Sequence, residues 1–452
     1  VINATGTVLH TNLGRSPNNM SFTGRYTNIE YDLTTLSRGK RNEYLSVLMN
    51  NLIRSEDIAF VNNNASSLFL SLKAISKSHN VQNVIISRGE IIEIGGSYRL
   101  PEIINETDLN LVEVGTTNKT KLNDYKKSLD KYPNSLILKV HRSNFSINGF
   151  TEDVSIAELA KLKNKYNVFL LHDLGSGLVI DKKFLEVNNL SIFRDEPFVQ
   201  DSLSAGADLV MFSGDKLFGS VQSGMIAGNE SLINKIKNYS LFRTYRCSPI
   251  TLFELQETVI KYLNKNEKEI PFWNLITEPY STLEERCKSI AKSISFSTTI
   301  EKGKSVIGGG TLPSETLESP ILLIKKEKTG NIINQLIKND TPIVPRIIKD
   351  KVCLDLRSVF NDQDAAETIK TKKAIEDMVD DLKVWKSTDR VSLIKELKKS
   401  WHQDMLWWGP SGIGATYTIE RYAEQHCRPF RDSFKERQFN GHICRITEGF
   451  FG

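Results

Sequence analysis

The feature that most constrains the fold is a series of seven short apolar runs between residues 58 and 228. The runs are Ile58–Val61, Val84–Ser87, Leu111–Val114, Leu136–Val140, Val168–Asp173, Leu209–Ser213 and Gly224–Ala227. They are mostly rich in Val, Ile and Leu without polar alternation, so we expect strands that are buried on both faces. Amphipathic stretches at Ala65–Ser78, Ile156–Tyr166 and Glu230–Tyr239 predict helices. The combination predicts a three-layer α/β fold with a mostly parallel sheet.

A different pattern follows residue 265 and indicates a smaller α+β domain. Its predicted helices are Leu283–Ser293, Asn331–Asn339 and Ala365–Leu382, and its strands include Pro320–Lys325 and Val352–Leu356. The run Gly308–Gly310 predicts a flexible loop, or a close approach of the backbone to a ligand. A chain of 452 residues has room for two or three domains. We expect an N-terminal arm at 1–34, a large domain at 35–265, the small domain at 266–388 and a further module at 389–452.

Net charge, hydropathy and cysteine spacing exclude several classes of protein. The net charge of +5 fits an anionic partner, but it fits ordinary solvated helix faces as well. No apolar run reaches the length of a membrane span, and the first residues show no secretory signal pattern. The five cysteines are widely spaced and form no Cys-x-x-Cys pair, so we expect neither a disulfide framework nor a metal site. These features predict a cytoplasmic protein.

Two predicted strands end in residues that suit one kind of chemistry. The run Leu209–Ser213 continues into Gly214-Asp215-Lys216, which places a lysine amine at the edge of the sheet. A partly desolvated amine at such a place can form a Schiff base. The run Val168–Asp173 places an aspartate at a second strand end. A lysine and an aspartate in this arrangement predict a pyridoxal phosphate site, since the aspartate pairs with the pyridinium nitrogen.

A phosphate site is predicted where the first strand gives way to a helix, at Asn62-Asn63-Asn64-Ala65. We expect Asn64 to be the N-cap, and the free N–H groups of the first turn suit a cofactor phosphate. Asn63, Asn64 and Ala65 are therefore candidate cofactor-binding residues, and an ordinary capped helix is the alternative. Ser213 is a candidate for the same phosphate, or a plain turn hydroxyl.

Further charged residues are candidates for substrate binding and catalysis. Arg243 and Arg246 are three residues apart, which would place them on one face of a helix. Two guanidinium groups on one face can clamp an oxyanion, although a solvated pair is the alternative. Asp215 adjoins Lys216, where it can bias the protonation of the amine or serve as an ordinary turn residue.

Nine motifs, in their order along roughly residues 1–380, resemble one family, the bacterial selenocysteine synthases or L-seryl-tRNA(Sec) selenium transferases. They are Asn3–Gly6, His10–Arg15, Ser87–Glu90, Glu93–Ser97, Val112–Asn118, Asp173–Gly177, Ser213–Lys216, Gly308–Thr316 and Leu354–Arg357. The resemblance implies a homo-oligomeric fold-type-I pyridoxal-phosphate transferase whose large domain binds the cofactor. Family members carry a tRNA-reading domain before the Asn-Ala-Thr-Gly motif. This sequence begins inside that motif, so we expect that domain to be missing from it.

The resemblance also implies roles for single residues. Lys216 matches the Schiff-base lysine, Asp173 the partner of the ring nitrogen, and Asp215 the acid beside the lysine. The arginines that hold the oxyanionic selenium donor are matched by Arg15, Arg243 and Arg246. The implied reaction converts seryl-tRNA(Sec) into selenocysteinyl-tRNA(Sec) with selenophosphate, and Lys216 removes the α-proton of the seryl group.

The last part of the chain, roughly 392–452, resembles the opening of a SnoaL-like polyketide-cyclase or ester-cyclase domain. The supporting runs are Trp401–Gly414 and His426–Phe430. The sequence ends before the strands that would close that cone-shaped barrel. We therefore expect a partial α+β tail that is weakly packed and has no catalytic role.

Two other functions stay open at this level. One is a pyridoxal-phosphate lyase or transferase that acts on a free small amino or sugar acid without tRNA. The other is a truncated or fused chain that binds cofactor or partners without turnover. The residues do not separate these two from the selenium transferase, because all three readings use the same lysine and aspartate.

Overall fold

The computed structural model describes residues 1–18, 26–94, 98–293, 297–324, 329–338 and 341–363. Contacts between residues divide the chain into two units, Val1–Thr371 and Lys372–Gly452. Every described residue belongs to the first unit. The predicted helix Ala365–Leu382 and the predicted SnoaL-like tail at 392–452 lie outside the described residues, and the domain boundaries given above stay predictions.

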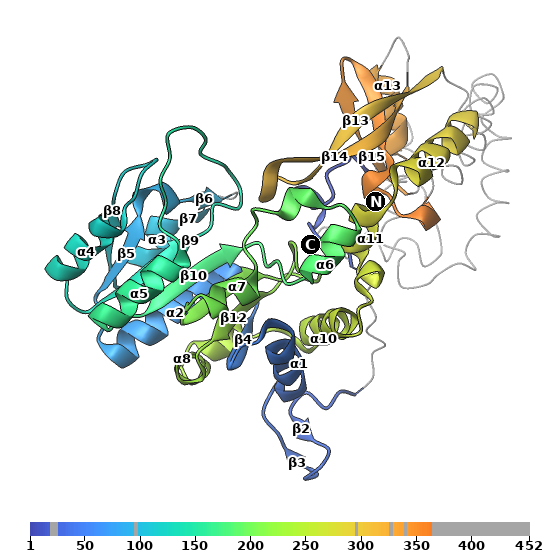
Figure 1. Cartoon of the computed structure of the whole chain (residues 1–452). Helices are drawn as coiled ribbons and strands as arrows, with labels where there is room; N and C mark the ends of the chain where they lie inside the picture. Colours follow the sequence, from blue (N-terminus) through green and yellow to red (C-terminus); the bar gives the residue numbers. More distant parts are fainter. Residues whose placement is uncertain (19–25, 95–97, 294–296, 325–328, 339–340, 364–452) are drawn as a thin grey trace, which may run out of the picture. The chain divides into compact units, whose positions relative to one another are not determined.

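A seven-stranded sheet forms the centre of the larger domain, in the order β4-β12-β11-β10-β9-β5-β8 (Figure 1). The strands are β4 (Asp57–Val61), β5 (Asn83–Ser87), β8 (Asn110–Val114), β9 (Ser135–Val140), β10 (Leu170–Gly175), β11 (Leu209–Ser213) and β12 (Gly224–Gly228). Within this sheet β12 runs antiparallel to both of its neighbours, β11 and β4, while β11, β10, β9, β5 and β8 pair in parallel. The predicted mostly parallel sheet is confirmed. Strand β10 extends two residues further than predicted, so Asp173 lies inside it rather than at its end.

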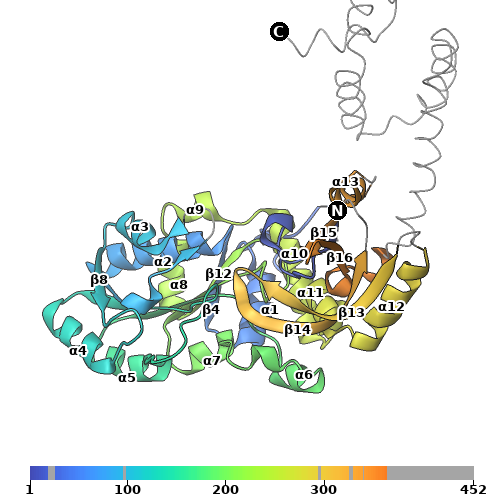
Figure 2. The same cartoon turned by 90° about the horizontal axis from the view of Figure 1, so that it is seen from above.

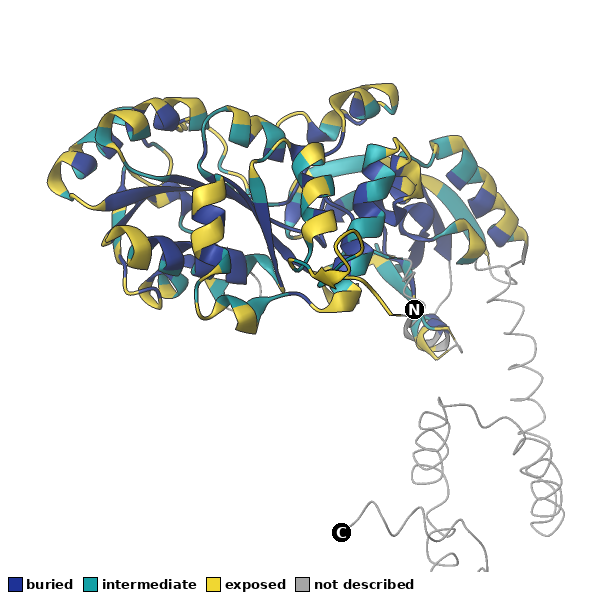
Figure 3. Ribbon diagram, turned by 90° about the horizontal axis from the view of Figure 1, so that it is seen from below, coloured by how far each residue is buried: buried dark blue, intermediate teal, exposed yellow. Residues whose placement is uncertain are grey.

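Helices cover both faces of this sheet. On one face α2 (Asn64–His79), α3 (Leu100–Asn105) and α8 (Glu230–Lys237) pack against a core that includes Leu209 and Met211. On the other face lie α4 (Leu122–Lys131), α5 (Ile156–Tyr166) and α7 (Val199–Ser204), and the alternate residues Val210 and Phe212 point to that side. Figure 3 shows the strands buried between helices whose outer faces are exposed. The strands are apolar on both faces because each face is covered.

The remaining elements of the larger domain are shorter or lie at its border. The helices are α1 (Glu43–Ile53), α6 (Lys182–Val187), α9 (Phe242–Tyr245), α10 (Pro249–Leu263) and α11 (Pro271–Thr277). Two hairpins complete the set, with strands β2 (Tyr31–Asp32), β3 (Ser37–Arg38), β6 (Glu93–Ile94) and β7 (Tyr98–Arg99). None of the helices in the described ranges has both the length and the apolar character to cross a membrane.

A second sheet has the order β1-β15-β16-β14-β13 (Figure 2). Its strands are β1 (Ile2–Ala4), β13 (Thr298–Gly308), β14 (Thr311–Ile324), β15 (Ile343–Ile348) and β16 (Lys351–Asp355), and α12 (Tyr280–Ser293) and α13 (Thr329–Ile337) pack on it. The start of the chain has no clear periodicity, yet β1 pairs in parallel with β15. The predicted flexible loop Gly308–Gly310 is wrong, because these glycines form the tight turn of the β13–β14 hairpin.

We expect Gly224→Ala to destabilise the protein. An added Cβ at Gly224 would lie 2.1 Å from the carbonyl oxygen of Asn63, at the point where β12 passes the start of α2. Overpacking of this kind costs about 1–3 kcal/mol, which thermal melting would show as a lower midpoint. Gly309→Ala is the matched control, since its added Cβ meets nothing within 4 Å. Equal melting temperatures for the two variants would contradict this reading of Gly224.

Candidate active site

The candidate site lies where three neighbouring strands of the large sheet end. Lys216 follows β11 and Asp173 lies in β10, with 5% and 7% of their surfaces exposed. Gly175, at the end of β10, separates the lysine from the segment after β9. A Cβ built on Gly175 would lie 3.5 Å from Lys216 Nζ and 3.4 Å from Ser143 Oγ. The predicted lysine and aspartate therefore lie at the same edge of the sheet.

Asp173 owes its orientation to the start of α2. Asn64 Nδ2 donates a hydrogen bond of 2.7 Å to Asp173 Oδ1, while Asn64 Oδ1 is buried and finds no partner among the described residues. Burial raises the pKa of Asp173, and the Asn64 hydrogen bond, the charge of Lys216 and the backbone of Gly175 act against that increase. The carboxylate is thus desolvated but supported by a donor and a cation.

The N-cap of α2 is Asn63, one residue before the predicted Asn64. The Asn63 side chain accepts a 2.8 Å hydrogen bond from the Ser66 amide. The helix begins one residue earlier than expected, which frees the Asn64 side chain to reach Asp173. The amides of Asn64 and Ala65 precede the first capped amide, and such amides suit an anion. Ser213 pairs with Gly224 across β11 and β12, and Gly224 packs against Asn63, so Ser213 lies on the same side of the sheet edge.

The environment of Lys216 favours a neutral amine. Burial lowers the pKa of Lys216 and the charge of Arg15 lowers it further, against the opposing charges of Asp215, Asp173 and Glu196. Arg15 Nη1 lies 2.9 Å from Asp215 Oδ2, and the Ser16 amide donates to the Asp215 carbonyl at 3.1 Å. The N-terminal segment thus brings its arginine to the lysine across some 200 residues of sequence.

The structure does not place Arg243 and Arg246 on one helix face. Helix α9 ends at Tyr245, and Arg246 follows it in an extended conformation. Arg246 lies 3.8 Å from Glu30, whereas Arg243 is exposed. The expected helical spacing is wrong because the helix has only four residues. No contact in the described part of the chain joins either arginine to Lys216.

Several residues that lie near Lys216 were not predicted from the sequence. The turn of the β13–β14 hairpin reaches the site, since a Cβ on Gly310 would lie 3.9 Å from Lys216 Cε, and the Leu312 amide donates to the Ser143 carbonyl at 3.2 Å. The glycine run was the one signal for this approach. Ser143 and His141 follow β9 much as Lys216 follows β11, so the same strand-end criterion would have found them.

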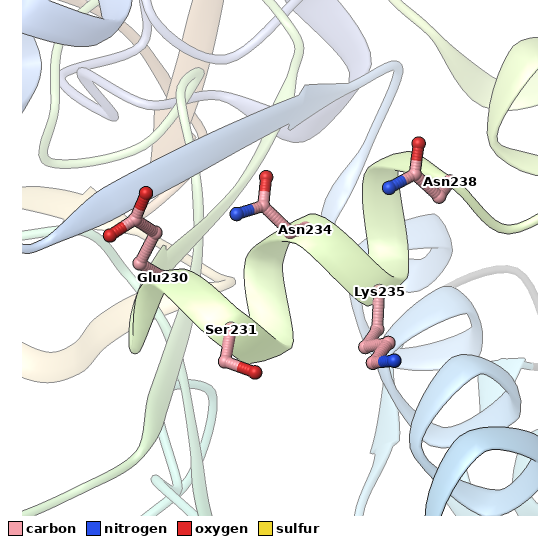
Figure 4. A pocket seen from close by; sticks show the side chains of 5 residues that line it. All are labelled: Glu230, Ser231, Asn234, Lys235 and Asn238. Carbon is pink, nitrogen blue, oxygen red and sulfur yellow. The ribbon is translucent and has the colours of Figure 1, made fainter.

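The hollow in Figure 4 is a different place. It is an open depression along α8 that is lined by Glu230, Ser231, Asn234, Lys235 and Asn238. None of the candidate residues borders it. The chemistry of the described residues is concentrated at the strand ends rather than in this hollow.

Comparison with known proteins identifies the family. Residues 1–360 match the family model of the L-seryl-tRNA selenium transferases. The chain belongs to this family. It is 40% identical over 368 residues to the L-seryl-tRNA(Sec) selenium transferase of Campylobacter fetus subsp. fetus, with 80% of each chain covered. The protein of the same name from Aquifex aeolicus is 38% identical over 393 residues, with 84% of each covered.

The fold class is confirmed as well. The solved structure of D-glucosaminate-6-phosphate ammonia-lyase superposes with a TM-score of 0.57 at 15% identity, covering 83% of this chain and 95% of the other. The chain has the fold of the fold-type-I pyridoxal-phosphate enzymes, and the predicted family membership holds over the larger sheet and the second sheet alike. At this level of identity the likeness to the lyase concerns the fold and not the reaction.

The buried polar atoms at the strand ends fit pyridoxal phosphate. Asn64 Oδ1 and Ser176 Oγ are both buried, and each is without a hydrogen-bond partner in the described chain. Unpaired buried groups of this kind are costly unless a ligand or water satisfies them. With a buried amine, a buried carboxylate and a helix start at one edge, the donor set suits a ring nitrogen, a carbonyl carbon and a phosphate.

We expect Asp173→Asn to stabilise the protein near neutral pH while it removes activity. The folded state raises the pKa of Asp173, so the ionised carboxylate weakens folding as the pH rises above the unfolded pKa. The amide introduced by this substitution would keep an acceptor for Asn64 without the buried charge. Melting curves at pH 3.5 and pH 7.5 measure this: the gain should be larger at the higher pH. A lower melting temperature at pH 7.5 would contradict the assignment of a desolvated carboxylate.

Proposed function

We propose that this chain converts seryl-tRNA(Sec) into selenocysteinyl-tRNA(Sec), with selenophosphate as the selenium donor and pyridoxal phosphate as the cofactor, in the cytoplasm. The observation that supports this most directly is that Lys216 and Asp173 are both buried near the ends of the adjoining strands β11 and β10, in a chain 40% identical to a selenium transferase. Curated relatives from several bacteria carry the same name, with about four-fifths of each chain covered.

The residues at the strand ends have separate tasks in this reaction. Lys216 Nζ would hold the carbonyl carbon of the cofactor and Asp173 its ring nitrogen. The start of α2 at Asn63–Ala65, with Ser213, would hold its phosphate. Pyridoxal phosphate supplies an electron sink for the negative charge that develops at the α-carbon of the seryl group. Asp173 would support that role because its carboxylate, held by Asn64, would keep a proton on the ring nitrogen.

Lys216 is also the base of the reaction. Its pKa is lowered by burial and by Arg15, which raises the fraction of neutral amine that can take the α-proton. Asp215 holds Arg15 beside this amine. The turn of the β13–β14 hairpin lies over Lys216 Cε and limits the access of water to the reacting atoms.

Arg15, Arg243 and Arg246 bind selenophosphate in this proposal. Arg15 carries the strongest support, since its guanidinium group lies beside Asp215 and its charge acts on Lys216. A guanidinium group presents several donors in one plane, so Arg15 can bind an oxyanion while it keeps its bond to Asp215. Selenium held there would approach the β-carbon from the side of the lysine.

The experiment that tests the proposed function compares the wild type with Lys216→Ala. Wild type mixed with pyridoxal phosphate should show a visible absorbance band and should form selenocysteinyl-tRNA(Sec) from seryl-tRNA(Sec) and selenophosphate. Lys216→Ala should lose the band and at least about 10³-fold in rate, because it removes both the attachment point and the base. Lys265→Ala is the control, because it removes an exposed lysine that is not one of the candidate site residues.

Two results would contradict the proposal. If Lys216→Ala keeps the same band and rate as the wild type, the site is elsewhere. If the wild type releases pyruvate or ammonia from free amino acids but leaves seryl-tRNA(Sec) unchanged, the chain is a lyase for small substrates.

We further propose that the chain forms a homo-oligomer through the β2–β3 hairpin and the outer face of α1. Five large apolar or aromatic side chains are exposed there: Tyr31, Leu33, Leu36, Tyr44 and Val47. Figure 1 shows this hairpin projecting beside α1 at the border of the larger domain. Exposed apolar side chains gathered on one surface are typical of an interface, and a second copy of this chain fits the homo-oligomer that the family resemblance implies.

We expect the double variant Leu36→Asp, Val47→Asp to dissociate the oligomer, because it would bury two carboxylates in an apolar contact. Light scattering coupled to gel filtration measures the molar mass. The mass should fall toward 51.2 kDa, the mass of one chain. Val187→Asp, at a still more exposed apolar site on α6, should leave the mass unchanged. Equal masses for the double variant and the wild type would exclude this surface as the interface.

A further inference from the structure

A histidine and a glutamate next to the site have no task in the reaction described so far. His141 follows β9, and Glu196 lies in the loop that leads to α7. His141 Nε2 and Glu196 Oε2 are 3.2 Å apart. Glu196 is only 4% exposed, and its Oε1 is buried without a partner in the described ranges. Burial of a carboxylate costs free energy of folding, which indicates that Glu196 has a function.

His141 adjoins the site, and its charge is close enough to act on the Asp173 carboxyl. Its backbone amide donates to the carbonyl of Asp173 at 2.8 Å, so the histidine directly adjoins the strand of the essential aspartate. Two residues further on, Ser143 faces Lys216 across Gly175, and the Ser143 carbonyl accepts from Leu312 of the hairpin turn. The segment from 141 to 143 is therefore enclosed between the strand ends and the β13–β14 hairpin.

The contact with Glu196 selects which nitrogen of His141 can act. A carboxylate that accepts from Nε2 fixes the orientation of the imidazole and leaves Nδ1 to exchange a proton. About 23% of the His141 side chain is exposed, so the ring also reaches solvent. The neighbouring His172 differs, because it is fully enclosed and its Nδ1 lies 3.2 Å from Ser202 Oγ of α7.

We propose that His141, oriented by Glu196, is the acid that protonates the hydroxyl of the seryl group as it leaves. This inference rests on the proposed function. The electron pair left at the α-carbon after loss of its proton forms a double bond to the β-carbon. The bond between the β-carbon and oxygen breaks with its electron pair on oxygen, the proton on His141 Nδ1 passes to that oxygen, and water departs. The neutral imidazole then regains a proton from solvent. Lys216 keeps the α-proton as its own task, and Glu196 is a positioning residue that acts through His141.

The test separates the two proton transfers with His141→Asn. Loss of the α-proton is followed as deuterium uptake from heavy water into seryl-tRNA(Sec), and loss of the hydroxyl as the release of pyruvate after the tRNA ester is hydrolysed. We expect His141→Asn to lower the second rate about 10²-fold, as for loss of a general acid. Deuterium uptake, the affinity for pyridoxal phosphate and the visible absorbance band should stay as in the wild type. His79→Asn, at an exposed end of α2, is the control.

A substrate that needs no acid provides the second measurement. With β-chloroalanyl-tRNA(Sec), chloride leaves without a proton, so His141→Asn should match the wild type within about twofold. Glu196→Gln should show the same pattern with a smaller loss on the seryl substrate, and Glu267→Gln, another buried glutamate, should show none. A deficit of His141→Asn that persists with the chloro substrate would overturn the acid role.

The outcomes distinguish this inference from the proposed function. If the wild type takes up deuterium and loses the hydroxyl, and His141→Asn does both at the same rates, the inference is overturned. The proposed function then still stands. Equal losses of deuterium uptake and elimination in His141→Asn would also overturn it, since they indicate a role in holding the cofactor. A wild type that does neither reaction overturns both proposals.

Discussion

The burial of one amine beside one carboxylate is the constraint on which the rest of this structure depends. Lys216 and Asp173 are both almost fully buried. Burial lowers the pKa of Lys216 and raises the pKa of Asp173, which favours the neutral form of each. A buried charge pair usually costs more than its attraction returns unless other groups complete its hydrogen bonds. Here Asn64 donates a hydrogen bond to the carboxylate, and the charges of the ion pair Arg15–Asp215 act on the amine. The cost is understandable if the two groups are kept for chemistry.

Segments far apart in the sequence are brought to this pair. The first residues contribute β1 to the second sheet and then place Arg15 against Asp215, while the β13–β14 hairpin of that sheet brings Gly310 next to the lysine. The amide of Leu312 joins the hairpin to Ser143 in the larger domain. A shift of the second sheet would therefore change both the cover over Lys216 and the position of Arg15. This coupling gives the second sheet a role in the site although it carries none of the predicted catalytic residues.

The sheet shows why strand ends were informative and helix spacing was not. Parallel strands align their carboxyl ends at one edge, so Asp173 and Lys216 could be expected together from local sequence alone. The same reasoning extends to His141, which follows the strand next to that of Asp173. Arg243 and Arg246 failed the helix rule because α9 stops after one turn, and no pattern of three residues can reveal where a short helix ends. The sequence predicted the N-cap at Asn64, one position too late. The N-cap is Asn63, and Asn64 orients the Asp173 carboxylate instead.

Periodicity, strand-end position and ordered motifs predicted the seven central strands, three of the helices that cover them, the family, and Lys216 and Asp173 as candidate site residues. Tertiary structure alone decided that β1 joins the second sheet, that the glycine turn approaches Lys216, and that Glu196 meets His141. Those contacts join residues some 55 to 340 positions apart, as in the pairing of Ile2 with Ile343. Local sequence patterns span only a few residues and cannot predict contacts between residues so far apart in the chain. The packing of buried faces determines these contacts.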